Sequence, residues 1–451
     1  MAMDAMDILQ AKRGPEAAVN VPSVHLWRGR PVRRMHVMVK PTGSLCNLDC
    51  TYCYYLSKQE LLGKPEQWRM PDYVLETFIR HYFEGQNHKE VVFSWQGGEP
   101  TLLGLDFFKK VVEIEKRYCP PHIRCENDLQ TNGTNLDDSW CEFLHEAVFL
   151  VGLSIDGPKR LHDAYRRDKS GKGSFDQVFR AVKLLKKHDV SFATLTCVNQ
   201  LTAKHPLEVY RFLRDVIGAK RMQFIPIVEP VGFRHTAPQR WGQGRMPLSG
   251  APETRPGHPS SIVEEWSVDP EEWGDFLCRI FDEWYRKDLG KIYVQYFDAA
   301  VETWMGHVSP LCTQSPLCGK GLALERDGSV YACDHYVYPE YRLGNIMEKP
   351  LESMAYSEQQ ERFGKAKEGL LPDYCRRCEY QFACFGECPK NRFVKSPDGQ
   401  PGLNYLCQGW KKFFAHIDNP IQEIVRLLGG TVRKEAVSRQ ADNWVPEKKE
   451  S

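Results

Sequence analysis

Cysteine spacing is the feature that most constrains this chain of 451 residues. Eleven of the sixteen cysteines fall into two groups, three within residues 46–53 and eight between residues 312 and 407. Disulfides are rare where the compartment is reducing, so we interpret the grouped cysteines as metal ligands. The other five fit no ligand spacing, and we expect them to pack as small hydrophobic side chains. They are Cys119, Cys125, Cys141, Cys197 and Cys278.

The charge balance and the amino terminus exclude several classes of protein. Lys and Arg total 60 against 59 for Asp and Glu, so no net positive charge favours nucleic acid or an anionic membrane surface. The first residues lack the apolar core of a signal peptide, and no window approaches the roughly 18 apolar residues of a membrane span. We therefore expect a cytoplasmic protein that binds no nucleic acid and no membrane.

Short apolar runs alternate with amphipathic helical patterns between residues 35 and 228. The clearest helical period covers residues 174–188. Such alternation predicts a parallel sheet with right-handed crossovers, either an open doubly wound sheet or a partial barrel, with ligands at the carboxyl ends of the strands. Six strands are predicted, at residues 35–39, 91–95, 128–131, 149–155, 191–198 and 222–227.

The loop after the first predicted strand carries Cys46, Cys50 and Cys53 in a C-x3-C-x2-C arrangement. Three thiolates can hold three irons of a 4Fe–4S cluster and leave the fourth iron open to a substrate. A zinc site, which usually has four protein ligands, and a four-ligand ferredoxin-type cluster are the alternatives.

The eight cysteines of the second group can form two sets of four. The sequence around them has little periodicity, so metal ligation can supply part of the folding free energy. Two zinc sites are the alternative to two iron–sulfur clusters. These cysteines are Cys312, Cys318, Cys333, Cys375, Cys378, Cys384, Cys388 and Cys407.

The first loop, with Tyr52 directly before its third cysteine, resembles the signature of the radical S-adenosylmethionine (SAM) superfamily. The second group resembles the SPASM domain of peptide-modifying members. The resemblance implies an α/β fold, a partial (β/α)6 TIM-like barrel followed by a cysteine-rich SPASM domain with two auxiliary clusters. It also implies three 4Fe–4S clusters and S-adenosyl-L-methionine, whose S–C5′ bond is broken by an electron to give a 5′-deoxyadenosyl radical.

The same resemblance assigns ligands residue by residue. Cys46, Cys50 and Cys53 would hold the first cluster. Two auxiliary sets would interleave, a near set of Cys312, Cys318, Cys333 and Cys388 and a distant set of Cys375, Cys378, Cys384 and Cys407. Contacts to SAM would come from Tyr52, Gly97, Gly98, Glu99, Ser154 and Arg166, although the sequence is equally compatible with an exposed, solvated Arg166.

Among families, the chain most resembles the anaerobic sulfatase-maturating enzymes, through CNLDCTYCYY, WQGGEPTL and DGSVYACDHYVYP over about residues 37–414. These enzymes oxidise a Cys or Ser of a sulfatase polypeptide to Cα-formylglycine. The resemblance implies a sulfatase polypeptide and an electron donor such as flavodoxin or ferredoxin as partners. Asp334 would act as general base, and Tyr55 and Gln96 would surround the substrate side chain. Two departures are a long segment at residues 231–262 and the sequence CFGECPKNR, where other members have Gly-Gly before the cysteine.

Two other functions remain open at this stage, namely a SPASM maturase of a different ribosomal peptide and a non-catalytic iron–sulfur or zinc protein. An open iron also predicts sensitivity to oxygen. The expected domains are an extension at 1–34, the barrel at 35–230, a Gly/Pro-rich insertion or linker at 231–265, a helical connection at 266–311, the SPASM domain at 312–415, and a helix and tail at 416–451.

Overall fold

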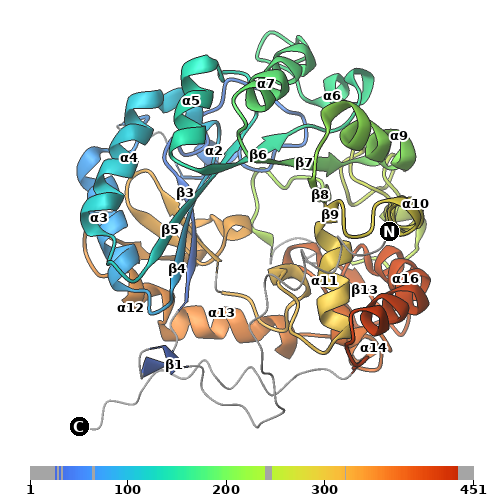
Figure 1. The fold of residues 1–451 in the computed structure, drawn as a ribbon. Helices are drawn as coiled ribbons and strands as arrows, with labels where there is room; N and C mark the ends of the chain where they lie inside the picture. Colours follow the sequence, from blue (N-terminus) through green and yellow to red (C-terminus); the bar gives the residue numbers. More distant parts are fainter. Residues whose placement is uncertain are drawn as a thin grey trace, which may run out of the picture.

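The computed structural model describes residues 26–27, 30–31, 34–62, 67–238, 246–319 and 321–434, so most of the expected extension at 1–34 lies outside the described residues. All six predicted strands are present as parallel neighbours in one sheet (Figure 1). Five begin within one residue of the prediction, whereas β5 begins four residues earlier, at Arg124. They are β3 (His36–Lys40), β4 (Glu90–Trp95), β5 (Arg124–Thr131), β6 (Phe149–Ser154), β7 (Phe192–Val198) and β8 (Arg221–Pro226).

The helices between these strands form an arc on the outer side of the sheet (Figure 1). In α7 the buried Val178, Ala181, Val182 and Leu185 recur three and four residues apart, which places them on one face toward the strands. The helices of this region are α2 (Lys58–Leu62), α3 (Asp72–Glu84), α4 (Leu105–Tyr118), α5 (Asp138–Glu146), α6 (Lys159–Tyr165), α7 (Phe175–Lys187), α8 (Gln200–Ala203) and α9 (Pro206–Arg211), and α9 continues as a π-helix, Phe212–Ile217.

The strand order identifies a partial barrel. Strands β3 to β8 lie side by side in chain order, whereas a doubly wound sheet reverses its order at a switch point. The sheet also extends further than the sequence indicated. Strand β9 (Tyr293–Val294) pairs in parallel with β8, and β10 (Gly321–Glu325) pairs in parallel with β3 at the other edge.

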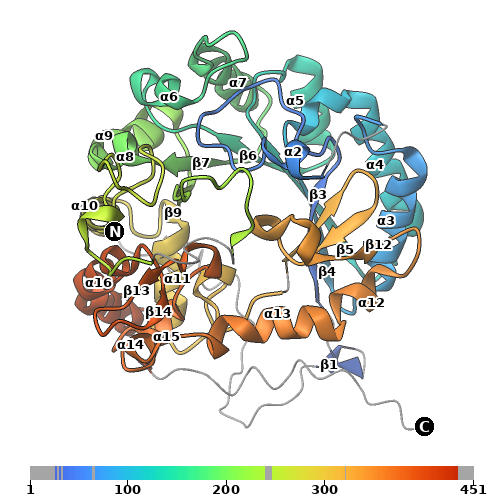
Figure 2. The same ribbon diagram turned by 180° about the vertical axis from the view of Figure 1, so that it is seen from behind.

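The cysteine-rich region is joined to the barrel through this extension. An antiparallel meander continues from β10 into β11 (Ser329–Tyr331) and β12 (Arg342–Asn345), and Figure 2 shows it beside β3. The short pairs β1 (Leu26–Trp27) with β2 (Arg30–Pro31) and β13 (Val394–Lys395) with β14 (Pro401–Leu403) form separate sheets. The later helices are α10 (Pro270–Lys287), α11 (Gln295–Trp304), α12 (Leu351–Ala355), α13 (Glu358–Gly369), α14 (Asp373–Arg376), α15 (Gln381–Cys384) and α16 (Cys407–Leu427).

Helix α16 crosses the boundary that we expected between residues 415 and 416, because it begins at a predicted cluster ligand, Cys407, and continues to Leu427. It packs closely on α10. A Cβ atom built on Gly409 would lie 2.1 Å from the carbonyl oxygen of Pro270, so only glycine allows this approach. Helix α16 therefore links the second cysteine group to the helical connection.

The segment 231–265 connects the barrel to the cysteine-rich region. The Val231 amide donates to the Ile262 carbonyl (3.0 Å), which closes the segment at its base. Farther along, the Ser249 amide donates to the Lys395 carbonyl (2.8 Å), and the Tyr405 hydroxyl donates to the Thr254 carbonyl (2.9 Å). In the described ranges, no helix is both long and apolar enough to cross a membrane.

Candidate active site

The first cysteine loop leaves β3 after Lys40 and is held by the turn that follows β4. The Gly98 amide donates to the Gly43 carbonyl (2.7 Å), and the Glu99 amide donates to the Leu45 carbonyl (2.8 Å). A Cβ atom on Gly98 would lie only 1.9 Å from the Leu45 oxygen. Glycine at this position thus lets the turn approach the backbone directly before Cys46.

The Glu99 side chain points into the protein. It is 1% exposed, and its two carboxylate oxygens accept hydrogen bonds from the Thr101 amide (3.1 Å) and hydroxyl (2.6 Å), the Thr131 hydroxyl (2.7 Å) and the Asn132 amide (2.7 Å). These bonds tie together the ends of β4 and β5. The Glu99 carboxylate thus has a structural role in joining these two strand ends.

The thiols of the first loop are buried and lie close enough to raise one another's pKa, so their charged forms need a bound metal to stabilise them. Burial raises the pKa of Cys46 to about 12, with a further contribution from the Glu99 carboxylate, and burial also raises the pKa values of Cys50 and Cys53. The Cys46 sulfur lies 3.4 Å from the Leu48 amide nitrogen and 3.8 Å from Asn132 Nδ2, and both of these groups can donate to a thiolate. Three buried thiolates on one loop need a positive group between them, which an iron–sulfur cluster supplies.

Arg166 lies beside this loop and is buried, at 7% exposure, which excludes the solvated surface arginine. Its guanidinium forms two hydrogen bonds with the Asp156 carboxylate, at 2.9 and 3.1 Å. The Tyr52 hydroxyl donates to the same carboxylate, and the Arg166 guanidinium carbon lies 5.6 Å from the centre of the Tyr52 ring. Arg166 and Tyr52 thus meet at Asp156, a residue that the sequence patterns did not reveal.

Ser154, the last residue of β6, lies on the same side of the barrel. Its hydroxyl accepts from Gln130 Nε2 (3.1 Å). One further group near Arg166 was not expected there. The Cys197 sulfur lies 3.5 Å from Arg166 Nη2, so Cys197 contacts a polar network, whereas Cys141 and Cys278 are buried as predicted.

The predicted base and substrate contacts converge on Lys40. The Lys40 ammonium forms an ion pair with Asp334, donates to Gln96 Oε1 (3.1 Å), and lies 4.4 Å from the centre of the Tyr55 ring. Tyr55 in turn donates to Glu325 on β10. Sequence reasoning missed Lys40, although its position directly after the first predicted strand, at the edge where ligands gather, was an available signal.

Asp334 is held in its charged form. Burial alone would raise its pKa, but Lys40, His335 and the Tyr54 hydroxyl together outweigh burial and hold the pKa below its usual value. Tyr54, which directly follows the third cysteine of the first loop, was also missed by the sequence reasoning. Its hydroxyl donates to Asp334, so the first loop and the second cysteine group share this carboxylate.

Two further buried lysines lie near Asp334. Lys58 is 1% exposed and lies 3.4 Å from the centre of the Tyr338 ring, and burial lowers its pKa to about 7. Lys390 donates to the Val228 carbonyl (3.0 Å) and forms an ion pair with Glu229. The site therefore holds three buried lysines, whose amino groups can donate hydrogen bonds to a substrate that presents carbonyl oxygens.

The four cysteines of the predicted near set come together around the end of β11. Burial is the largest of the effects that raise the pKa of Cys333. The nearby sulfurs of Cys312, Cys318 and Cys388 raise it further. The Lys367 ammonium donates to the Cys312 and Thr313 carbonyls, at 2.6 and 2.7 Å. Burial raises the pKa values of Cys312 and Cys318, and Lys367 opposes part of that rise. This donor set fits an iron–sulfur cluster.

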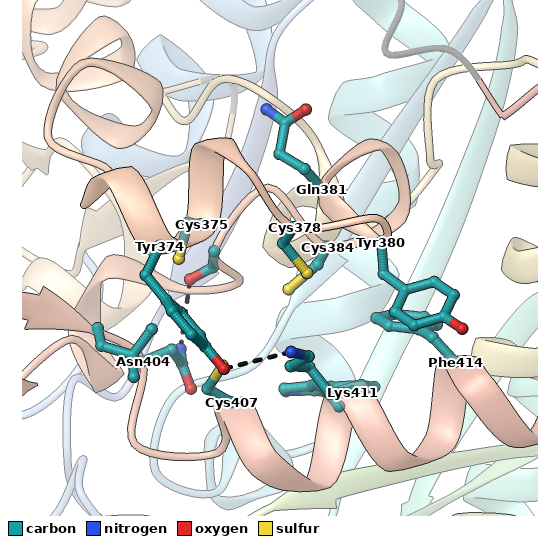
Figure 3. Close-up of a pocket in the computed structure, with 13 residues that line it drawn as sticks. Tyr374, Cys375, Cys378, Tyr380, Gln381, Cys384, Asn404, Cys407, Lys411 and Phe414 are labelled. Atoms are coloured by element: carbon teal, nitrogen blue, oxygen red, sulfur yellow. Dashed lines mark hydrogen bonds between the residues drawn. The ribbon is translucent and has the colours of Figure 1, made fainter. Parts of the chain in front are cut away.

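The four cysteines of the predicted distant set line a single pocket, where Figure 3 shows their sulfurs facing a common space. Two come from short helices, Cys375 in α14 and Cys384 in α15, and Cys407 begins α16. Tyr374 and Lys411 stand at the pocket, joined by a 3.2 Å hydrogen bond. The cysteines of each predicted set thus lie near one another, although the two sets interleave along the chain.

The departure at CFGECPKNR is visible in the backbone. Phe385, Gly386 and Glu387 have φ angles of 45°, 66° and 50°, a left-handed conformation that costs a residue with a side chain about 1 kcal/mol or more. The Glu387 carboxylate accepts from the Cys388 amide (2.5 Å) and from Asn404 Nδ2 (3.0 Å), which holds this turn before the cysteine.

Comparisons with known proteins agree with this geometry. The radical SAM superfamily model matches residues 41–213, and the SPASM model, described as an iron–sulfur cluster-binding domain, matches residues 318–379. A serine-type anaerobic sulfatase-maturating enzyme of Bacteroides thetaiotaomicron is 45% identical over 85% of this chain and 89% of that protein. A cysteine-type enzyme of Clostridium perfringens is 34% identical over 85% of this chain and 96% of its own length.

A solved structure gives the same result. Native anSMEcpe with bound AdoMet is 33% identical, with a TM-score of 0.73, and the match covers 87% of this chain and 99% of that chain. The same protein has been solved with AdoMet and the Kp18Cys peptide together. The chain belongs to the anaerobic sulfatase-maturating enzymes of the radical SAM superfamily, and its carboxyl-terminal region contains a SPASM domain.

Proposed function

We propose that this protein oxidises a Ser or Cys residue of a sulfatase polypeptide to Cα-formylglycine. One observation carries the proposal. Asp334, the predicted base, sits between Tyr54 of the first cysteine loop and Lys40 at the carboxyl end of β3. A proton acceptor is thus placed beside the loop that would hold the first cluster, in a chain 45% identical to a serine-type sulfatase-maturating enzyme.

The proposal includes three 4Fe–4S clusters, held by the first-loop cysteines, the near set and the distant set. When bound, the first cluster with SAM supplies a radical that removes a hydrogen atom, and the auxiliary clusters accept electrons. Tyr52 and Arg166 with Asp156, the backbone of residues 97–99, and Ser154 are the groups proposed to surround SAM. The donor of the initial electron is proposed to be a small carrier such as flavodoxin or ferredoxin.

The chain's own residues would manage the proton. Asp334 is ionised and almost fully enclosed, so it can accept the proton of a substrate hydroxyl or thiol within hydrogen-bond reach. Lys40 and Tyr54 fix the orientation of the carboxylate. Gln96 and the Tyr55 ring flank Lys40 and are proposed to position the substrate side chain. Because eleven ligand thiols must stay reduced, we propose that the enzyme works in the cytoplasm.

The test is an anaerobic incubation of the iron- and sulfide-reconstituted protein with SAM, a strong reductant and two sulfatase-derived peptides. The peptides carry Ser or Cys in a C/S-x-P-x-R motif, and the products are analysed by mass spectrometry. Formylglycine in either peptide supports the proposal and identifies the substrate residue. The Asp334→Asn variant should still release 5′-deoxyadenosine but should lose at least 99% of peptide oxidation, on the order of the 10²–10⁴-fold effect of general bases.

Two results would count against the proposal. If 5′-deoxyadenosine forms while both peptides stay unchanged, the radical chemistry holds and the sulfatase assignment fails. If no 5′-deoxyadenosine forms although the first cluster is fully loaded, the radical reaction itself is wrong. A variant with Cys46, Cys50 and Cys53 all changed to Ala serves as the control for cleavage of SAM by the reductant alone.

A further inference from the structure

His335 contacts one of the predicted ligands of the near cluster. It lies in the 3₁₀ turn Asp334–Tyr336, and its Nδ1 is 3.5 Å from the Cys388 sulfur. Cys388 is 8% exposed, so water has little access to this contact. The amide of Lys390 also donates to the same sulfur. Cys388 is therefore a ligand whose sulfur has two protein donors.

The direction of the bond from His335 follows from the chemistry of the ligand. A cysteine that holds iron is a thiolate and has no proton to give. Nδ1 must therefore carry the hydrogen and donate it to the sulfur. Hydrogen bonds to ligand sulfurs draw electron density away from the metal, and they are one of the means by which a protein sets the potential of a cluster.

The same turn carries Asp334, the proposed general base. Asp334 precedes His335, and Tyr54 contacts both of them, through its hydroxyl on Asp334 and through its ring, 5.5 Å from the imidazole at an interplanar angle of 78°. In the proposed oxidation the substrate gives up one hydrogen atom, one proton and one further electron. Asp334, the proton acceptor, is thus followed directly by His335, whose imidazole contacts a ligand of the cluster that accepts the electron.

We propose that His335 is a positioning residue that raises the midpoint potential of the near auxiliary cluster by donating a hydrogen bond to Cys388. The inference rests on the proposed function, because it needs the near cluster to be the acceptor of the substrate's second electron. Its effect is specific: the first cluster and the distant cluster, which His335 does not touch, keep their potentials. Removal of the donor makes the near cluster a poorer acceptor without removing a ligand.

The experiment is an anaerobic redox titration of the full-length, reconstituted protein, followed by electron paramagnetic resonance. His335→Phe removes the donor and keeps a ring, whereas His335→Asn keeps an N–H near the position of Nδ1. The titrations are repeated with Cys46, Cys50 and Cys53 changed to Ala, so that only the auxiliary signals remain. The distant cluster in the same sample is the internal control.

We expect His335→Phe to reduce the equilibrium constant for one-electron reduction of the near cluster about tenfold, a shift of about 59 mV to lower potential. His335→Asn should restore most of that loss. An unchanged potential in a fully loaded His335→Phe protein overturns the inference, and so does an equal shift in the Phe and Asn variants, which would mean that the retained N–H of Asn has no effect. If the Phe variant binds less iron, His335→Leu is titrated in its place.

This test separates the inference from the proposed function. If the protein without first-loop cysteines binds no near cluster, the proposed function loses its electron acceptor. If both auxiliary clusters are present and only the effect of His335 is missing, the proposed function stands and the inference alone fails.

Discussion

Lys40 and Asp334 form an ion pair between the end of β3 and the turn that follows β11, with side-chain exposures of 2% and 11%. The two residues belong to different domains in the sequence prediction, yet each compensates the charge of the other in a site with little water. Removal of one partner alone leaves an uncompensated buried charge, whereas removal of both does not.

The Lys40→Met variant should therefore be strongly destabilised. We expect a loss of about 3–5 kcal/mol in the free energy of unfolding, because the Asp334 carboxylate stays buried without its cation. The double variant Lys40→Met with Asp334→Asn should recover a large part of that loss. Anaerobic urea denaturation, followed by tryptophan fluorescence, measures both. A double variant no more stable than Lys40→Met would contradict the explanation that the uncompensated Asp334 carboxylate causes the loss.

Gly98→Ala should displace the first cysteine loop, since the new Cβ would lie 1.9 Å from the Leu45 oxygen. We expect the reconstituted variant to lose about one third of its iron, that of one cluster in three, and all SAM cleavage. Gly369→Ala is the matched control, because a Cβ atom there has no neighbour within 4 Å. Full iron content in Gly98→Ala would mean that the loop tolerates the displacement.

The two auxiliary sets should behave as independent units. Cys384→Ala should remove the distant cluster and keep the near one, and Cys333→Ala should do the opposite. The double change Cys384→Ala with Cys407→Ala should lose no more iron than Cys384→Ala alone, because both belong to one set. Iron analysis together with Mössbauer spectroscopy checks this. If the double variant lost as much iron as the two single variants together, the assignment of both cysteines to one cluster would be wrong.

Glu115, which lies on α4 away from the catalytic edge, predicts a pH dependence of stability. Burial raises its pKa to about 8, although Asn127 donates to it at 2.8 Å. The folded protein therefore holds a proton that the unfolded chain releases near pH 4.5, the ordinary value for Glu. This stabilisation is complete below about pH 4.5 and is lost as the pH rises to about 8.

In that pH range the free energy of unfolding of the wild-type protein should fall as the pH rises. Its slope should be steeper than the slope of the Glu115→Gln variant by roughly 1.4 kcal/mol per pH unit. Urea denaturation at several pH values between these limits gives both slopes. Glu113→Gln, an exposed change on the same helix, should keep the wild-type slope. Parallel curves for wild type and Glu115→Gln would show that Glu115 is already ionised in the folded protein at neutral pH.

The sequence predicted the barrel well because most of its strands are short apolar runs followed by a periodic helix. The polar start of β5, residues 124–127, is the reason that this strand was predicted too short. Strands β9 and β10 were not predicted. β9 has only two residues, and the partner of β10 is β3, which lies at the opposite end of the chain. Local patterns contain no information about such a pairing.

The candidate site was predicted through its cysteines and its motif residues, because ligand spacing is visible in the sequence. The charged residues that pair with these motif residues could not be identified from the sequence. Asp156, which pairs with Arg166, and Lys40, which pairs with Asp334, are single charged residues in segments with no distinctive spacing. Only the folded chain shows that each charge has a buried counterpart.

The pairing of β10 with β3 has a mechanical consequence. The first cysteine loop begins at the end of β3, and Cys333 with Asp334 follows β11, so both loops leave strands of one hydrogen-bonded sheet in which β10 lies between β3 and β11. The two centres cannot separate without breaking that ladder. Electron transfer between the substrate and the near cluster should then take place over a constant distance, and its rate should not depend on solvent viscosity.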